Sequence, residues 1–405
     1  MTDKQIIREL AKRYMELATS EKQRKAKQRM RDTNDLKLVR PPVLIDEIPW
    51  YQMDIDGDLV CHCEDPMARE VEGHLRRHLY LGKYFRSDVI LDDYYRVPFT
   101  FRSSGCGWTV EEDILRTDGQ NNIVSHHYKD MLATEEDLAR FHMPEFYLDK
   151  EGDERKINYL SDLFGDSMEV KLSGHSYVYC MPWDEIMTLR GMEPVIFDFY
   201  DRPEHLHAIM EKLCAVVEAK MEFVEKHAFV DNDPAWLHCT PGYVSGLAEK
   251  GWKATWFRGA AQGFSTVSPQ MHEEFELAYV RPIAEKFAYT YYGCCEPLDN
   301  KMDILRSISN LRKVGVSPWA NVERMGEELR GDYVFSRKPN PAYVASRTDP
   351  EVIRREIEET VKVCQKYGCP LDITLKDIST VSHRPENLIL WSETVSDVLD
   401  RYYGE

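Results

Sequence analysis

The feature that most constrains the fold is a regular alternation of short apolar runs with long amphipathic helices, which begins near residue 168. Residues 203–227 carry apolar side chains on one helical stripe, with Pro203 at a favourable first-turn position, and residues 350–366 show the same pattern. Six runs have the length and composition of strands: 169–172, 235–239, 287–292, 313–317, 333–336 and 371–375. Strands that alternate with helices pair in parallel through right-handed crossovers, so the sequence predicts an α/β fold.

Residues with reactive, polar or aromatic side chains lie at the ends of these runs, and their distribution favours a closed barrel over an open sheet. They follow nearly every predicted strand: His175, His238, Cys239, Cys294, Cys295, Glu296, Trp319, Arg337, Lys338 and Asp377. A barrel active site draws on many successive strand ends, whereas an open sheet concentrates its site at one switch point. We therefore predict a TIM (β/α)8 barrel with its active site at the carboxyl ends of the strands.

The first 40 residues differ from the rest in pattern and in charge. Ile6, Leu10, Tyr14 and Leu17 recur at helical spacing, which predicts one or two helices over residues 3–31. Residues 1–40 contain twelve Lys or Arg and six Asp or Glu, although the whole chain has a net charge of −18. Such a basic stretch is typical of a solvated helix face or of a surface that docks an acidic partner. We predict an N-terminal helical extension over 1–40 and one barrel domain over 41–405.

The composition excludes several classes of protein. The negative net charge repels phosphate backbones, which argues against nucleic acid as a partner. No run approaches the roughly 20 apolar residues that a membrane span needs, and the first residues lack the apolar core of a signal peptide. The ten cysteines are mostly scattered, which indicates free thiols or metal ligands rather than a disulfide framework. The sequence therefore predicts a cytoplasmic enzyme.

Several ordered segments resemble a known family. They are Met-Pro-Trp-Asp-Glu-Ile at 181–186, Arg-Gly-Met-Glu at 190–193, Asp-Arg-Pro-Glu at 201–204, YYGCCEPLD, VGVSPWANVERM and VFSRKPNPAYVA. Together they resemble the uroporphyrinogen decarboxylase superfamily, and more closely its corrinoid-dependent methyltransferase branch, which includes the methyltransferase I component of aromatic O-demethylases. The resemblance covers roughly residues 55–400, and the Arg-Gln-Ala-Gly-Arg type of motif of the true decarboxylases is absent from the chain.

The resemblance implies a specific reaction. The enzyme would move a methyl group from a methoxylated aromatic compound to the cob(I)alamin of a separate corrinoid protein, with zinc as Lewis acid. The chain has no cobalamin-binding motif of the Asp-x-His-x-x-Gly kind, so the cobalt would come from that partner. The alternatives are a cofactor-free decarboxylase and a catalytically silent barrel that binds corrinoid or aromatic ligands. A homodimer is possible in each case.

The strongest local signal for a metal is Tyr292-Gly293-Cys294-Cys295-Glu296. In zinc-dependent relatives a His-x-Cys stands at this strand end, so Tyr292 replaces the histidine, and the last-strand cysteine falls near Asp377. The implied ligands are Cys294, Cys295, Glu296 and Asp377, with Cys239 or His238 in reserve, and the catalytic residues are His238, Glu296 and Asp377. Side chains alternate along a strand, so we expect only one of the two thiols to point into the barrel. The competing interpretation is two cysteines packed as small hydrophobic residues.

Aromatic side chains near the predicted mouth suit a flat aromatic substrate, although such residues often belong to the core. The candidates for substrate binding are Tyr94, Trp108, His175, Trp183, Trp236 and Trp319. Arg337 and Lys338 could fix a substrate carboxylate or hold an acidic residue of the barrel. We expect the corrinoid partner to contact the loops near residues 240 and 320, with the basic N-terminal helices as a second docking surface.

Overall fold

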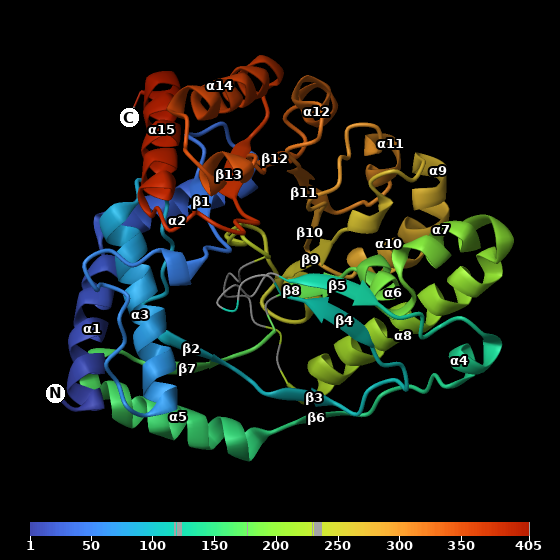
Figure 1. Cartoon of the computed structure of the whole chain (residues 1–405), viewed down its shortest axis with the longest axis horizontal. Coiled ribbons are helices and arrows are strands. Elements are labelled where there is room, and N and C mark those ends of the chain that lie inside the picture. Colours follow the sequence, from blue (N-terminus) through green and yellow to red (C-terminus); the bar gives the residue numbers. More distant parts are fainter. Residues whose placement is uncertain (117–118, 120–123, 176, 229, 231–236, 405) are drawn as a thin grey trace.

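A computed structural model describes residues 1–116, 119, 124–175, 177–228, 230 and 237–404. At its centre is a curled sheet of seven parallel strands (Figure 1). In spatial order the strands are β1 (Val43–Ile45), β13 (Leu371–Leu375), β12 (Val334–Arg337), β11 (Leu311–Val316), β10 (Tyr289–Tyr292), β9 (Trp256–Gly259) and β8 (Tyr177–Cys180). The α/β class and the parallel pairing are confirmed.

The predicted closed eight-stranded barrel is not formed by the described residues, because the sheet stays open between β1 and β8. The chain beside β1 shows why. The backbone N–H of Asp88 donates to the carbonyl of Val43. The N–H of Val43, however, donates to the side-chain carboxylate of Asp88 at 2.8 Å rather than to a backbone carbonyl. Further along, the side chain of Gln23 bonds the carbonyl of Val89 and the N–H of Leu91. Side chains thus satisfy backbone groups that an eighth strand would have paired.

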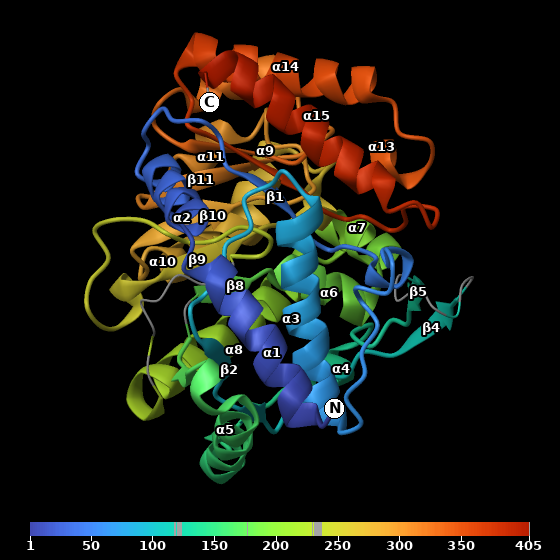
Figure 2. The same cartoon turned by 90° about the vertical axis from the view of Figure 1, so that its left-hand side faces the viewer.

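Helices surround the main sheet and the small ribbons beside it (Figures 1 and 2). They are α1 (Asp3–Ala18), α2 (Glu21–Asn34), α3 (Pro66–Tyr84), α4 (Glu135–Ala139), α5 (Lys150–Phe164), α6 (Pro182–Arg190), α7 (Met192–Asp201), α8 (Pro203–His227), α9 (Pro269–His272), α10 (Ala278–Ala284), α11 (Met302–Leu305), α12 (Val322–Leu329), α13 (Ala342–Ala345), α14 (Pro350–Tyr367) and α15 (Glu386–Tyr403). The main hydrophobic core lies between these helices and the sheet, and α14 and α15 lie side by side over the β13 end (Figures 1 and 2).

The N-terminal helices α1 and α2 form where helical spacing predicted them. The α1 helix packs on α3 and α5 through a separate apolar cluster that includes Ile7, Leu75 and Phe164 (Figure 2). Three small ribbons lie outside the main sheet: β2 (Tyr95–Pro98) with β7 (Val170–Ser173), β3 (Phe101–Ser103) with β6 (Phe146–Leu148), and β4 (Glu112–Leu115) with β5 (Ser125–Tyr128).

Two of the predicted strands are not strands of the main sheet. The run 169–172 became β7, which pairs with β2 rather than with the main sheet. In the run 235–239, the described residues Leu237, His238 and Cys239 form bends, and the strand that enters the sheet after α8 is β9 instead. The reason is that His238 and Cys239 both adopt left-handed backbone angles, which a strand does not allow. The four later strand predictions agree with β10 to β13 to within a few residues.

Candidate functional site

Three strand ends place reactive side chains at the same edge of the sheet. Glu47 follows β1, Cys294 and Cys295 follow β10, and Lys376 and Asp377 follow β13. Because all seven strands run in parallel, their carboxyl ends meet at one edge, as in barrel enzymes. These residues and the loop described below form what we call the mouth cluster.

Contacts across β10 and β13 link the two cysteines to the last strand. The sulfur atoms of Cys294 and Cys295 lie 3.7 Å apart. The Sγ of Cys295 lies 3.3 Å from Oδ2 of Asp377, and the ammonium of Lys376 donates to both, at 3.4 Å and 2.7 Å. The expected alternation of the two thiols is not observed, because β10 ends at Tyr292 and Gly293 turns the chain with φ of +93° before Cys294.

The loop between α8 and β9 adds His238 and Cys239 to the cluster. Nε2 of His238 lies 4.0 Å from Oε1 of Glu47, whose other oxygen accepts the N–H of Asp377 at 2.7 Å. The ligand atoms of Glu47, His238 and Cys239 all lie within 4.8 Å of one another. Six donor side chains from four parts of the chain therefore converge at the mouth: Glu47, His238, Cys239, Cys294, Cys295 and Asp377.

Backbone strain is concentrated in this cluster. Glu47, His238, Cys239 and Asp377 have φ values of 51°, 51°, 71° and 57°. Residues other than glycine rarely adopt such left-handed angles, and each costs of order 1–3 kcal/mol that the surrounding structure must offset. Strained residues of this kind gather at ligand-binding and active sites, so the backbone supports the same location as the side chains.

Electrostatics favour one thiolate in the cluster. The hydrogen bond with Cys295 lowers the pKa of Cys294 far below its ordinary value, and His238, Arg258 and Lys376 act in the same direction against burial. The same hydrogen bond raises the pKa of Cys295. Burial alone would lower the pKa of Lys376, but the charges of Cys294, Cys295 and Asp377 raise it. These interactions favour a thiolate on Cys294 and an ammonium on Lys376.

Glu296 lies beneath the cluster rather than within it. Its side chain is buried, and its two oxygens accept the backbone N–H groups of Ala261 at 3.1 Å and Cys294 at 2.9 Å. Burial, together with the nearby Cys294, raises the pKa of Glu296 to about 7. The carboxylate therefore holds the turn that carries the cysteines.

The donor set fits zinc. Zinc takes thiolate, imidazole and carboxylate ligands at about 2.0–2.3 Å, so the ligand atoms of one ion lie roughly 3–4 Å apart. The Cys294–Cys295 and Cys295–Asp377 separations of 3.7 Å and 3.3 Å fall in this range. An ion held by Cys295 and Asp377 would displace the hydrogen bonds that the ammonium of Lys376 donates to both residues.

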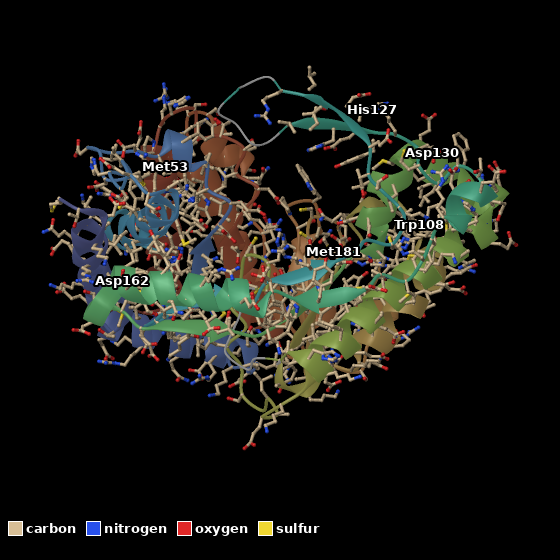
Figure 3. All side chains as sticks on the ribbon, turned by 90° about the horizontal axis from the view of Figure 1, so that it is seen from below. Met53, Trp108, His127, Asp130, Asp162 and Met181 are labelled. Carbon is tan, nitrogen blue, oxygen red and sulfur yellow. The ribbon has the colours of Figure 1, made fainter. Side chains whose placement is uncertain are left out.

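The aromatic candidates for substrate binding do not gather around the cluster. Tyr94 packs under Arg96 and Lys171, and Trp183 is fully buried, donating its indole N–H to the carbonyl of Phe275 at 2.8 Å. Trp108 donates to the carbonyl of Asp137, and Figure 3 shows it on the side that carries Asp130, outward of Met181, which follows β8. Trp319 follows β11 and is 70% exposed.

The remaining candidates are engaged elsewhere or lie outside the described residues. His175 packs against Phe99, and burial lowers its pKa to about 4. Trp236 lies outside the described residues. Arg337 is buried and bonds Glu356 at 3.0 Å and the carbonyl of Ser317 at 2.7 Å, and the buried Lys338 donates to Ser336 at 2.8 Å.

Sequence reasoning missed Glu47 and Lys376. Glu47 follows the short apolar run Val43–Ile45, whose three residues are too few to predict a strand with a functional end. Lys376 precedes Asp377 at the end of β13, and its position directly after a predicted strand was the available signal.

Comparisons with known proteins support the fold. The chain is similar to a solved methyltransferase from Methanosarcina mazei, with a TM-score of 0.50 and 13% sequence identity over 93% of this chain and 99% of that one. The sequence matches no model of a known protein family and no curated protein. Within the described residues, none of the helices has the length and apolarity to cross a membrane.

Proposed function

We propose that this chain is a corrinoid-dependent methyltransferase that takes a methyl group from a methoxylated aromatic compound. The observation that carries the proposal is the mouth cluster, in which thiol, imidazole and carboxylate donors converge at the carboxyl edge of a curled parallel sheet. The resemblance of the sequence to the methyltransferase branch of the uroporphyrinogen decarboxylase superfamily agrees with this chemistry.

Zinc, held by Cys294, Cys295 and Asp377 or by Glu47, His238 and Cys239, would supply Lewis acidity toward the ether oxygen. The chain's own residues position the donor and control charge. With the partner's cob(I)alamin as the methyl acceptor, the carbon–oxygen bond of the donor would break, the methyl group would pass to the cobalt, and the phenolate would leave with the bonding electron pair. The ammonium of Lys376 stands beside the cluster, where it stabilises the negative charge that develops on the leaving oxygen.

The partner has to reach the mouth, because the cobalt must approach the methyl carbon in line with the departing oxygen. The loop after β11 offers the exposed Trp319 on this side of the sheet. The corrinoid protein is expected to contact the loops near residues 240 and 320, with the basic N-terminal helices as a second docking surface.

The test is a cobalt methylation assay. The zinc-loaded protein is mixed with reduced corrinoid protein and a panel of methoxylated phenols and benzoates, and the loss of cob(I)alamin absorbance is followed. We expect methylation that requires both the aromatic ether and zinc. Full activity in protein stripped of metal, or decarboxylation of an aromatic acid without corrinoid, would refute the proposal and favour a decarboxylase.

A further inference from the structure

The helix α7 has apolar side chains on two opposite faces, and the described residues cover only one of them. Val195 and Phe199 are buried in the main core, where α7 packs on α6 and α8. A helix that is apolar on all sides is normally buried on all sides. The opposite face of α7, however, is 56%, 52%, 59% and 80% exposed at Met192, Ile196, Phe197 and Tyr200.

These four side chains form one stripe along the helix, which we call the α7 face. Met192, Ile196 and Tyr200 follow one another at intervals of four residues, and Phe197 lies beside the last two. Single apolar residues are normal on a protein surface, whereas a contiguous apolar patch marks a site of interaction. Figure 1 shows α7 at the edge of the molecule opposite α1.

Contacts on its buried side hold α7 in a fixed position. The ring of Phe199 stacks on Trp183 at 5.4 Å and meets Phe275 edge-on at 4.9 Å. The carboxylate of Asp198 accepts a hydrogen bond from the buried Arg190, the last residue of α6, at 2.5 Å. The α7 face is therefore presented by a rigid element, and a partner would bind it at little cost in ordering entropy.

The size of the α7 face matches what a stable dimer needs. A large side chain buries about 150–250 Å², so the exposed fractions of the four residues amount to roughly 400–600 Å². A standard interface buries about 800 Å² on each partner, and about 65% of a homodimer interface is apolar. Each copy then needs about 500 Å² of apolar surface, which the α7 face can provide.

The composition of the α7 face favours a permanent partner over a transient one. Interfaces that form and separate are about as polar as the rest of the surface, whereas homodimer interfaces are more apolar. The four side chains offer one polar group, the hydroxyl of Tyr200. A partner that comes and goes would leave this face in water between encounters, but a second copy of the chain covers it at all times.

The charged residues beside the α7 face are mainly acidic. Glu193, Asp201 and Glu204 are exposed, whereas the guanidinium of Arg202 donates to the carbonyl of Ala133 at 2.7 Å. Two copies would bring these like charges close together. Apolar contact rather than ion pairing therefore has to hold the dimer, and added salt should strengthen it by screening the repulsion.

We propose that the α7 face is the interface of a two-fold homodimer, in which α7 of one copy packs against α7 of the second. In such a dimer the same patch serves both copies. The contact also supports the open side of the main sheet, because α6, which leads into α7, follows the edge strand β8. This inference does not depend on the proposed reaction.

Sedimentation velocity of the full chain, over a range of micromolar concentrations and at low and high salt, tests the interface. We expect a dimer whose dissociation constant falls as the salt concentration rises. Phe197→Asp and Tyr200→Asp should each raise that constant by more than about tenfold, because each places a charge in the apolar contact. Both positions are exposed, so the variants should fold. A thermal melt identifies one that does not, and the other then decides.

The matched control is Leu38→Asp, which adds the same charge at an exposed leucine in the chain after α2 and should leave the dimer unchanged. A native chain that stays monomeric would overturn the proposal. Dimers of both α7 variants as tight as the native dimer would show that the copies meet elsewhere. A dimer that weakens as salt rises would also contradict the proposal, because ion pairs would then hold the two copies together.

Discussion

At the scale of single residues, the cluster depends on a close approach of two backbones next to Cys294. Gly293 directly follows β10 with φ of +93°, and Gly315 of β11 faces it. A Cβ at Gly315 would lie 2.6 Å from the carbonyl oxygen of Gly293 and 3.2 Å from the nitrogen of Cys294. These atoms belong to the backbone and cannot turn away, so glycine is required at 315 for the cysteines to hold their place.

Gly315→Ala is therefore expected to shift the Cys294 turn and to lower the free energy of unfolding by about 1–3 kcal/mol. Urea denaturation measures the loss. Gly331→Ala is the matched control, because the atom nearest to its Cβ is the carbonyl oxygen of Gly368 at 3.4 Å, an ordinary contact. Equal stability of the two variants would show that the strands can separate at no cost.

The two thiols should both matter for metal binding, because their sulfur atoms face the same cluster. Cys294→Ser and Cys295→Ser are each expected to reduce zinc affinity more than tenfold, since loss of an outer-shell partner alone costs about 10–100-fold. Elemental analysis and competition with a chelator measure this. Cys106→Ser, at a half-buried cysteine outside the cluster, should keep its zinc. Zinc retained in both cluster variants would place the ligands elsewhere.

At the scale of elements, the inner face of the sheet is held by charge rather than by apolar packing. Lys313 of β11 and Asp372 of β13 are fully buried and lie 2.6 Å apart. Ser336 of β12 lies between them in strand order and donates to Asp372 at 2.6 Å, while Lys338 donates to Ser336. The Tyr291 ring of β10 packs under Arg258 of β9 at 4.1 Å. These contacts tie five strands together through their inward-facing side chains.

Asp372→Asn should lower the free energy of unfolding by about 3–5 kcal/mol, because it leaves the buried ammonium of Lys313 without its counter-charge. Thermal or urea unfolding checks this against Asp332→Asn, an exposed aspartate that should change little. A loss under about 1 kcal/mol would mean that Lys313 finds another partner.

The same ion pair predicts a dependence on pH. Burial would raise the pKa of Asp372, but Lys313, Lys338 and the hydrogen bond from Ser336 lower it below its ordinary value. A lowered pKa in the folded state contributes stability that is present above the unfolded value near 4 and lost as the pH falls below it. The difference in stability between the native chain and Asp372→Asn should therefore be constant at neutral pH and shrink on acidification below about pH 4. A difference that grows on acidification would contradict this origin.

At the scale of the whole molecule, an N-terminal helix fixes part of the mouth cluster from a distance. Asn34, the last residue of α2, donates to the carbonyls of Tyr243 at 2.7 Å and Pro241 at 3.4 Å. The adjacent Asp35 accepts two hydrogen bonds from Ser245. The loop that begins with His238 and Cys239 is thus clamped by residues about 200 positions earlier in the chain.

Asn34→Ala should lower the free energy of unfolding by about 1–3 kcal/mol, because two carbonyls lose their buried donor. It should also weaken zinc binding, although Asn34 belongs to no predicted ligand set. Gln28→Ala, on an exposed face of the same helix, is the control for helix propensity. Loss of stability with zinc affinity unchanged would show that the loop keeps its conformation without the clamp.

The sequence by itself determined the elements whose pattern is local. Pro203 and the apolar stripe of residues 203–227 predicted α8 residue for residue, and the apolar run 371–375 predicted β13, because periodicity and first-turn chemistry act over a few residues. The same local signal identified Cys294, Cys295 and Asp377 as residues at strand ends, and the parallel sheet brings them together.

Only the tertiary structure decided what depends on distant contacts. The sheet stays open because the side chains of Gln23 and Asp88 form hydrogen bonds with backbone groups in and beside β1. The spacing of apolar residues in the sequence does not reveal hydrogen bonds of this kind. Glu47 and His238 become neighbours because β1, β13 and the loop after α8 meet at one edge. The left-handed angles of His238 and Cys239 turned a strand-like run into bends, since an apolar run of four or five residues carries too little periodicity to exclude a loop held in place by the rest of the fold.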